Sequence, residues 1–236
     1  MAENEKTHAR IVGALFIIAI VVSIAGGSLI DAALASPEMF LASPDNSTQL
    51  ITGVLLELIN GIAVVGIAIF LYPILRPVDE SLAIGYVVLR TVEVVVIVAA
   101  VVSPLTLYGL SQGYAAEYPA EVSHLSALAA SLMATRAQLV GFLLALFFSL
   151  TGLVLYYLLY RSKLVPRFIS IWGLIAVVLI LSWNFYMLLG YETSFGIFLA
   201  LPIILNELVL GIWLIVKGFS EVETVSQPEK VTLRET

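Results

Sequence analysis

The sequence predicts an all-α, single-domain bundle of six transmembrane helices, and its composition is the first reason. Of 236 residues, 61% are hydrophobic and 12% are charged, with a mean hydropathy of +1.06. Soluble domains are about 25% charged, so this composition excludes a water-soluble globular protein. The charges also gather at the ends, since residues 1–10 and 220–236 hold 10 of the 28 and leave 18 for the 209 residues between. Lipid is therefore the expected solvent for most of the chain.

Long apolar runs define where the chain should cross the membrane. The first run, residues 11–30, contains no charge, and at ~1.5 Å rise per residue it reaches ~30 Å, the thickness of the hydrocarbon. A cleavable signal peptide is the alternative there, although signal h-regions are usually about 7–15 residues long. The runs lack the alternation of an outer-membrane β-barrel. The predicted spans are about 11–30, 49–75, 82–107, 137–160, 168–189 and 195–216.

Short connections between these spans favour one helical domain over residues 1–219. The polar segment 220–236 contains Pro228 and is expected to be a disordered cytoplasmic tail. Before the fourth span, residues 119–135 place apolar side chains at helical spacing after Pro119. This segment is interpreted as an extension of span four on the outer surface, with a lid over a cavity as the alternative.

The basic residues predict the orientation of the bundle. Cytoplasmic loops carry an excess of lysine and arginine. The loops 31–49, 109–135 and 190–194 contain neither residue, so they are predicted to face outward, with both termini cytoplasmic. The basic residues on the opposite side are Lys6, Arg10, Arg76, Arg161, Lys163, Arg167, Lys217, Lys230 and Arg234.

Several kinds of chemistry are excluded by what the sequence lacks. A net charge of −6 argues against a nucleic-acid footprint, and the absence of cysteine removes disulfides and thiol chemistry. The two histidines, His8 and His124, lie outside the predicted spans, so no intramembrane histidine metal site is expected. Phosphate-loop, zinc-helix and nucleophile-elbow motifs are absent. We therefore expect no metal, no cofactor and no enzymatic activity.

Polar residues inside the predicted spans are the candidate functional residues. An ionisable side chain in hydrocarbon costs ~2.5–3.5 kcal/mol on insertion scales, so each one needs a partner or a purpose. The primary candidates for a polar cluster, or for a ligand or proton site, are Glu57, Asn60, Arg90, Glu93, Asn206 and Glu207. The secondary candidates are Arg136, Gln138 and Asn184.

Depth along the helices predicts that several of these residues meet. Counting ~1.5 Å per residue from the span ends places Asn60, Glu93 and Glu207 near the midplane, with Arg90 one turn away. Arg90 is expected to pair with Glu93 or with Glu207, leaving the other carboxyl to hold a proton. Arg136 could offset Glu57 if the helices bring them together.

Prolines and small residues modify the spans. Pro104 and Pro202 each remove a backbone hydrogen bond, which favours a packed kink, with a helix broken at a midplane site as the alternative. Gly141 and Ala145 stand at a spacing that permits close contact between helices, which is a weak signal.

Four segments, 9–21, 71–79, 155–175 and 201–219, resemble a bacterial and archaeal family of six-helix membrane proteins, domain-of-unknown-function family 4386. The resemblance covers about residues 9–219. Its most specific pieces are the basic turn around Arg161, Pro166 and Arg167 and the Pro-x-x-x-Asn-Glu pattern of the sixth span. It implies the six-helix topology and implies no particular activity.

These observations predict a multi-pass protein of the prokaryotic plasma membrane, with the lipid bilayer as its partner and no nucleic acid. The favoured function is non-enzymatic, of a structural, sensory or partner-binding kind, with the polar cluster locking the bundle. The alternative is a small-solute or proton-linked transporter that uses the midplane carboxylates and Arg90. An intramembrane enzyme is a distant third. The sequence specifies neither a ligand, nor a protein partner, nor an oligomeric state.

Overall fold

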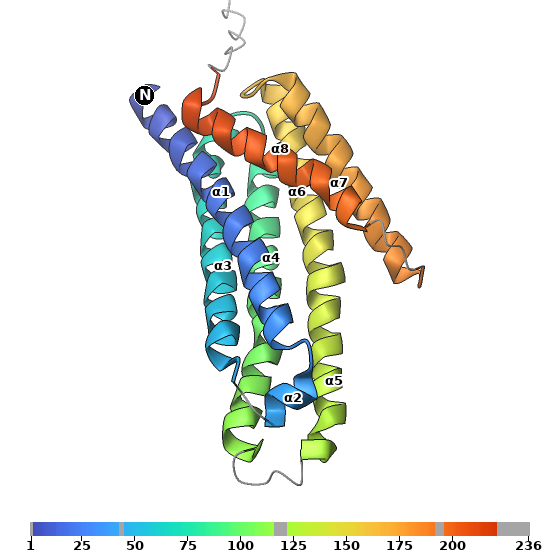
Figure 1. Ribbon diagram of the computed structural model, residues 1–236. Coiled ribbons are helices and arrows are strands. Elements are labelled where there is room, and N and C mark those ends of the chain that lie inside the picture. Colours follow the sequence, from blue (N-terminus) through green and yellow to red (C-terminus); the bar gives the residue numbers. More distant parts are fainter. Residues whose placement is uncertain (1, 43–44, 116–121, 192–195, 221–236) are drawn as a thin grey trace, which may run out of the picture.

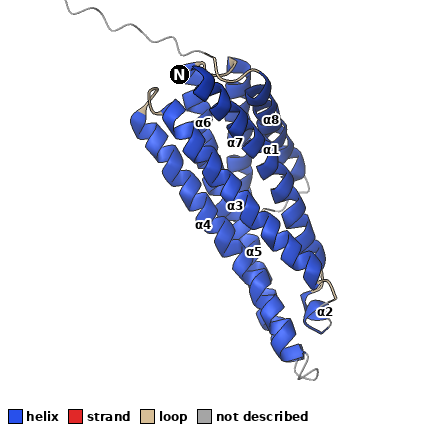
Figure 2. Ribbon diagram, turned by 90° about the vertical axis from the view of Figure 1, so that its left-hand side faces the viewer, coloured by secondary structure: helices blue, strands red, loops and turns tan. Residues whose placement is uncertain are grey.

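The computed structural model describes residues 2–42, 45–115, 122–191 and 196–220, and these ranges contain helices and no strand. Figures 1 and 2 show the helices as an elongated bundle. Two of the elements, η1 and η3, are short π-helical segments. In chain order the elements are α1 (Ala2–Ala33), α2 (Pro37–Ala42), α3 (Ser47–Leu75), α4 (Glu80–Leu110), η1 (Ser111–Ala115), α5 (Val122–Gln138), η3 (Leu139–Leu144), α6 (Ala145–Ser162), α7 (Arg167–Leu188) and α8 (Gly196–Val216).

Within the described residues, six helices are long and apolar enough to cross a membrane, which confirms the predicted fold class. The predicted spans agree with α3, α4, α7 and α8 to within a few residues. The first span is longer than expected, because α1 begins at Ala2 and continues through Asp31 to Ala33. The prediction for 220–236 falls, apart from Ser220, outside the described residues.

The fourth span shows the largest difference from the sequence prediction. Helix α5 continues through η3 into α6, so the predicted span 137–160 and the extension expected before it form one unbroken helical rod. The 17 residues of α5 add ~25 Å to this rod. The 22 residues of α7 and the 21 of α8 end well short of it, and α5 projects beyond them beside α2 (Figure 1). Residues 119–121 lie outside the described residues.

Both prolines of interest lie inside continuous helices. Helix α4 continues through Pro104, and helix α8 continues through Pro202. The alternative of a broken midplane helix at Pro202 is therefore wrong.

Two apolar clusters lie at different levels of the bundle. One gathers Leu71, Tyr86, Leu155 and Ile169 with their neighbours near the ends of α3 and α6 that bear basic residues. The other gathers residues such as Ile30, Leu50, Val101 and Leu107 toward α2 and α5. On α1, α3 and α4, the polar side chains inside the membrane lie between these two apolar clusters. The fold therefore holds a polar layer between two apolar layers.

Glycines allow α1 to pack closely on its neighbours α3 and α8. A Cβ atom added at Gly53 of α3 would lie 2.9 Å from the Gly26 carbonyl oxygen of α1. A Cβ atom added at Gly211 of α8 would lie 3.0 Å from the Gly13 carbonyl oxygen of α1. Gly141, in contrast, has open space around its Cα, so the suggested close helix contact at Gly141 is wrong.

The Gly53 contact yields a stability prediction. Gly53→Ala is expected to lower the free energy of unfolding by about 1–3 kcal/mol, because the added methyl would overpack the α1–α3 contact. Gly85→Ala on α4 is the matched control, since a Cβ atom there meets nothing within 4 Å. Thermal unfolding in detergent measures both variants. Equal melting temperatures for the two would contradict the predicted overpacking.

Orientation across the membrane remains a prediction of the charge pattern, and the cysteine-free sequence makes it directly testable. Ser36 and Ser220 are both exposed and lie at opposite ends of the bundle. We expect a membrane-impermeant thiol reagent to label Ser36→Cys in intact cells and Ser220→Cys only after permeabilisation. The reverse pattern would overturn the predicted orientation.

Candidate ligand-binding cavity

A buried ion pair on α4 is the centre of the polar layer. Arg90 and Glu93 are each 3% exposed, and Arg90 Nη1 donates to both carboxylate oxygens of Glu93 at 3.0 and 3.2 Å. Arg90 Nε donates to the Tyr86 hydroxyl at 3.2 Å. Tyr86, Arg90 and Glu93 lie three or four residues apart, so they share one face of the helix. Of the two carboxyls considered for Arg90, Glu93 is the one that forms the pair.

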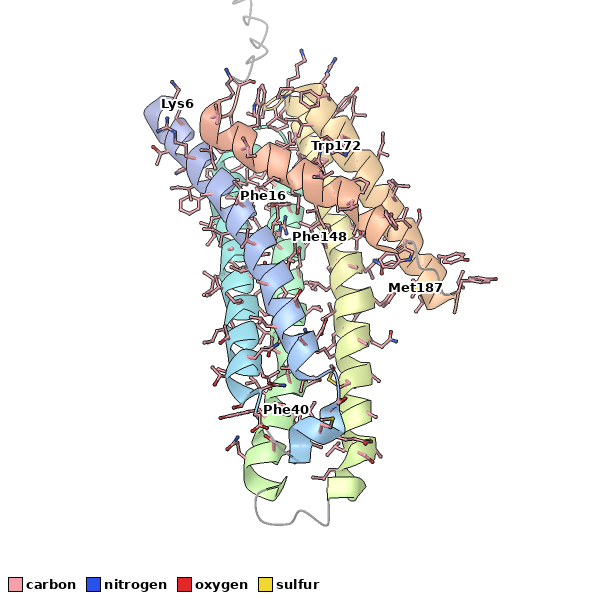
Figure 3. The ribbon with its side chains drawn as sticks, in the orientation of Figure 1. Lys6, Phe16, Phe40, Phe148, Trp172 and Met187 are labelled. Atoms are coloured by element: carbon pink, nitrogen blue, oxygen red, sulfur yellow. The ribbon has the colours of Figure 1, made fainter. Side chains whose placement is uncertain are left out.

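The ion pair lies in the wall of a cavity of about 300 Å³ that is lined by residues from all six spans. Most of the lining is aliphatic or aromatic. Figure 3 shows two of the aromatic side chains, Phe16 on α1 and Phe148 on α6, at a similar height in the bundle. The polar lining residues come from α1, α3, α4, α7 and α8, and they are Ser23, Asn60, Arg90, Glu93, Trp183 and Glu207.

Glu207 differs from Glu93 because it has no basic partner. It lines the cavity from α8, but no arginine or lysine nitrogen of the described residues lies within 4.0 Å of its carboxylate. Arg90 lines the same cavity, but its ion pair is with Glu93. Tyr86 and Tyr156 lie within electrostatic range of Glu207. One carboxyl in this cavity therefore has no neutralising ion pair.

A second pocket of about 400 Å³ continues from the cavity toward α5. The two spaces share Ser23, Asn60, Val140 and Leu144 as lining residues. The second pocket adds three ionisable groups, which are Asp31, Glu57 and Arg136. Together the two spaces extend from the polar layer toward the end of the bundle that carries α2.

Arg136 of the second pocket is held by α1 and α4. Its side chain is 5% exposed, and Nη2 lies 3.8 Å from Asp31 Oδ1. Nη1 donates to the Ala100 carbonyl at 3.3 Å. Glu57, the partner considered from the sequence, lines the same pocket, but the ion pair of Arg136 is with Asp31.

Three sequence candidates lie outside both spaces. Asn206 is fully buried and donates from Nδ2 to the Ile169 carbonyl at 2.9 Å, which ties α8 to α7. Asn184 is 2% exposed, and its Nδ2 has no hydrogen-bond partner among the described residues. Gln138 is exposed on the surface of the bundle. The primary cluster therefore narrows to Asn60, Arg90, Glu93 and Glu207, with Glu57 in the adjoining pocket.

The structure adds residues that the sequence did not single out. Trp183 lines the cavity, and its Nε1 is buried without a hydrogen-bond partner among the described residues. Tyr86 could have been found, because it precedes Arg90 by one helical turn. Asp31 was placed in a loop, since the predicted first span ended at residue 30. Trp183 carried no sequence signal that separates it from Trp172 or Trp213.

In the described part of the chain, no three histidine, aspartate or glutamate side chains are grouped as metal ligands. The six apolar helices define a multi-pass integral membrane protein. A family model, the domain of unknown function DUF4386, matches residues 11–218, so the chain belongs to that family. Searches of curated proteins and of solved structures return no match.

Proposed function

We propose that this protein is a non-enzymatic, multi-pass protein of the prokaryotic plasma membrane that binds a small molecule in its central cavity. The observation that carries the proposal is Glu207, a carboxyl without an ion pair that lines a largely apolar space between all six spans. Ionisable groups at this depth in membrane proteins commonly mark ligand or ion pathways.

The alternative is that the polar residues only lock the bundle together. Asn206 fits that role, because its amide bonds a carbonyl across the α7–α8 contact. The cavity residues fit it less well, because protein interiors leave few voids larger than a water molecule. A volume of about 300 Å³ reaches the size at which ligand pockets begin, and its mixture of apolar walls with a few convergent polar groups is typical of them.

Cavity filling tests this proposal. Ala19 lines the cavity on α1, whereas its neighbour Ile18 is 43% exposed on the outside of the bundle. We expect small molecules that raise the melting temperature of the purified protein in nanodiscs to lose this effect on Ala19→Phe and to keep it on Ile18→Phe. A library of neutral, cationic and anionic fragments supplies the probes. If no fragment distinguishes the two variants, the cavity does not bind small molecules.

Transport is a second candidate, and one specific feature favours it. The second pocket shares four lining residues with the cavity and leads toward the α2 end of the bundle. A pocket that leads from the binding site toward one end of the bundle provides access from one side of the membrane. Alternating access requires such access from each side in turn. A proton-linked mechanism would use Glu207, because it is the cavity carboxyl outside the ion pair.

A further inference from the structure

We propose that the ligand of the cavity is a hydrophobic monocation, such as a small substituted amine or quaternary ammonium, that replaces a proton on Glu207. This inference rests on the proposed ligand-binding function and names its ligand class. Its starting point is charge balance. Arg90 and Glu93 neutralise each other through their 3.0 Å contact, so an ionised Glu207 leaves the cavity with one surplus negative charge. In a low-dielectric site that charge needs either a proton or a monovalent cation.

An anionic ligand would meet a less favourable environment. Arg90 is the one cation that lines the cavity among the described residues, and its Nε and Nη1 atoms already serve Tyr86 and Glu93. An anion at the remaining Nη2 would lie near two carboxyl groups, Glu93 and Glu207. Binding an anion would therefore add negative charge to a site that already has a surplus.

The aromatic walls suit a cation whose charge is covered by hydrocarbon. Phe16, Phe148 and Trp183 line the cavity from α1, α6 and α7, and the remaining apolar lining is aliphatic. Aromatic faces attract ammonium groups through their quadrupole, and the attraction strengthens when water is excluded. A divalent metal ion would instead favour several carboxylate ligands, and no group of three or more histidine, aspartate or glutamate side chains that could hold a metal occurs among the described residues.

The adjoining pocket carries the same sign of charge. Asp31 and Glu57 outnumber Arg136 there, and the segments 31–49 and 109–135 contain no lysine or arginine. A path lined by surplus acidic groups raises the local concentration of cations and steers them inward. The pocket and the cavity therefore both carry surplus negative charge.

Proton exchange at Glu207 depends on the groups that face it from each neighbouring helix. Arg90, Glu93 and Tyr86 of α4 and Tyr156 of α6 lie within electrostatic range of Glu207. Ser23, Asn60 and Trp183 are the polar lining residues on α1, α3 and α7, and none of them carries a charge. Arg90 already pairs with Glu93. When a cation binds at Glu207, the carboxyl group of Glu207 therefore releases its proton to solvent, and the net charge of the cavity does not change.

The test compares three probes of similar shape on the full chain in nanodiscs: benzyltrimethylammonium, its neutral carbon analogue neopentylbenzene, and the anion benzylsulfonate. Isothermal titration in two buffers of different ionisation enthalpy measures affinity and proton release together. We expect the cation to bind tightest, with one proton released per cation, and Glu207→Gln to weaken its binding by at least about tenfold. Glu38→Gln, at an acidic residue that lines neither space, is the matched control and should leave binding unchanged.

The outcomes separate the two proposals. If neopentylbenzene or benzylsulfonate binds as tightly as the cation and Ala19→Phe abolishes that binding, the cavity binds ligands but the cation inference is overturned. Equal affinity of the cation for the wild type and for Glu207→Gln also overturns it. If none of the three probes binds in a manner sensitive to Ala19→Phe, both the ligand-binding proposal and the cation inference are overturned.

Discussion

Arg90→Leu is expected to lower the free energy of unfolding by about 3–5 kcal/mol, because it leaves the Glu93 carboxylate buried without its partner. Glu93 is 3% exposed, and both its oxygens accept from the same guanidinium nitrogen, so the variant removes both of these hydrogen bonds at once. The Tyr86 hydroxyl loses its donor in the same variant. Chemical or thermal unfolding of the purified protein in a mild detergent measures the change.

A double variant distinguishes loss of a charge partner from loss of packing. Arg90→Leu with Glu93→Leu removes both charges and fills the space with hydrocarbon, so most of the lost stability should return. Replacing a buried pair by apolar residues is often neutral or stabilising. A double variant as unstable as Arg90→Leu alone would mean that the side-chain shape of Arg90, and not its charge, supports the bundle.

The polar layer could be anticipated from the sequence because depth in a membrane follows almost directly from position along a helix. Counting ~1.5 Å per residue from the span ends brought Asn60, Glu93 and Glu207 to one level, and all three line the cavity. Depth says nothing about the direction in which a side chain points. Asn206 lies at the same depth as Glu207 and precedes it by one residue, which corresponds to a rotation of ~100° around the helix. Its side chain therefore faces α7.

Lateral contacts were less predictable for the same reason. In lipid, apolar residues face both neighbouring helices and the bilayer, so hydrophobicity no longer marks the buried face. Ile62 is 72% exposed whereas Ile67 on the same helix is 1% exposed, and their residue type is identical. The glycine pairs that set the α1 contacts, Gly26 with Gly53 and Gly13 with Gly211, could be recognised only once the helices were placed together.

The extent of helix α5 illustrates a different limit. Hydropathy detects the part of a helix that crosses hydrocarbon, and only the helical spacing of the apolar residues in 119–135 predicted that span four extends further outward. The segment 122–138 mixes alanine, serine and leucine, which form helix in any solvent without marking a membrane. Its residues Met133, Arg136 and Ala137 contribute to the wall of the second pocket, as a continuation of α6 rather than as a lid.

Glu207→Gln is expected to abolish cation-driven proton movement while leaving the protein folded. Glutamine keeps the shape of the side chain, and Glu207 has no ion pair to lose, so the melting temperature should change little. The amide can neither release a proton nor neutralise a cation. In proteoliposomes with a pH indicator in the external medium, benzyltrimethylammonium added outside should exchange for protons and acidify that medium with the wild type, and Glu207→Gln should give the signal of protein-free vesicles.

Glu93→Gln supplies the comparison that makes this result specific. Glutamine at Glu93 leaves Arg90 buried without a counter-charge, so this variant is expected to lose stability by several kcal/mol, as Arg90→Leu does. The two carboxyls thus separate into a structural group, Glu93, and a group whose proton is exchanged, Glu207. If Glu207→Gln retains wild-type proton movement, Glu207 is not the exchanging group. If Glu207→Gln instead unfolds like Glu93→Gln, its carboxyl supports the bundle, and the architectural interpretation of the cavity replaces the one based on transport.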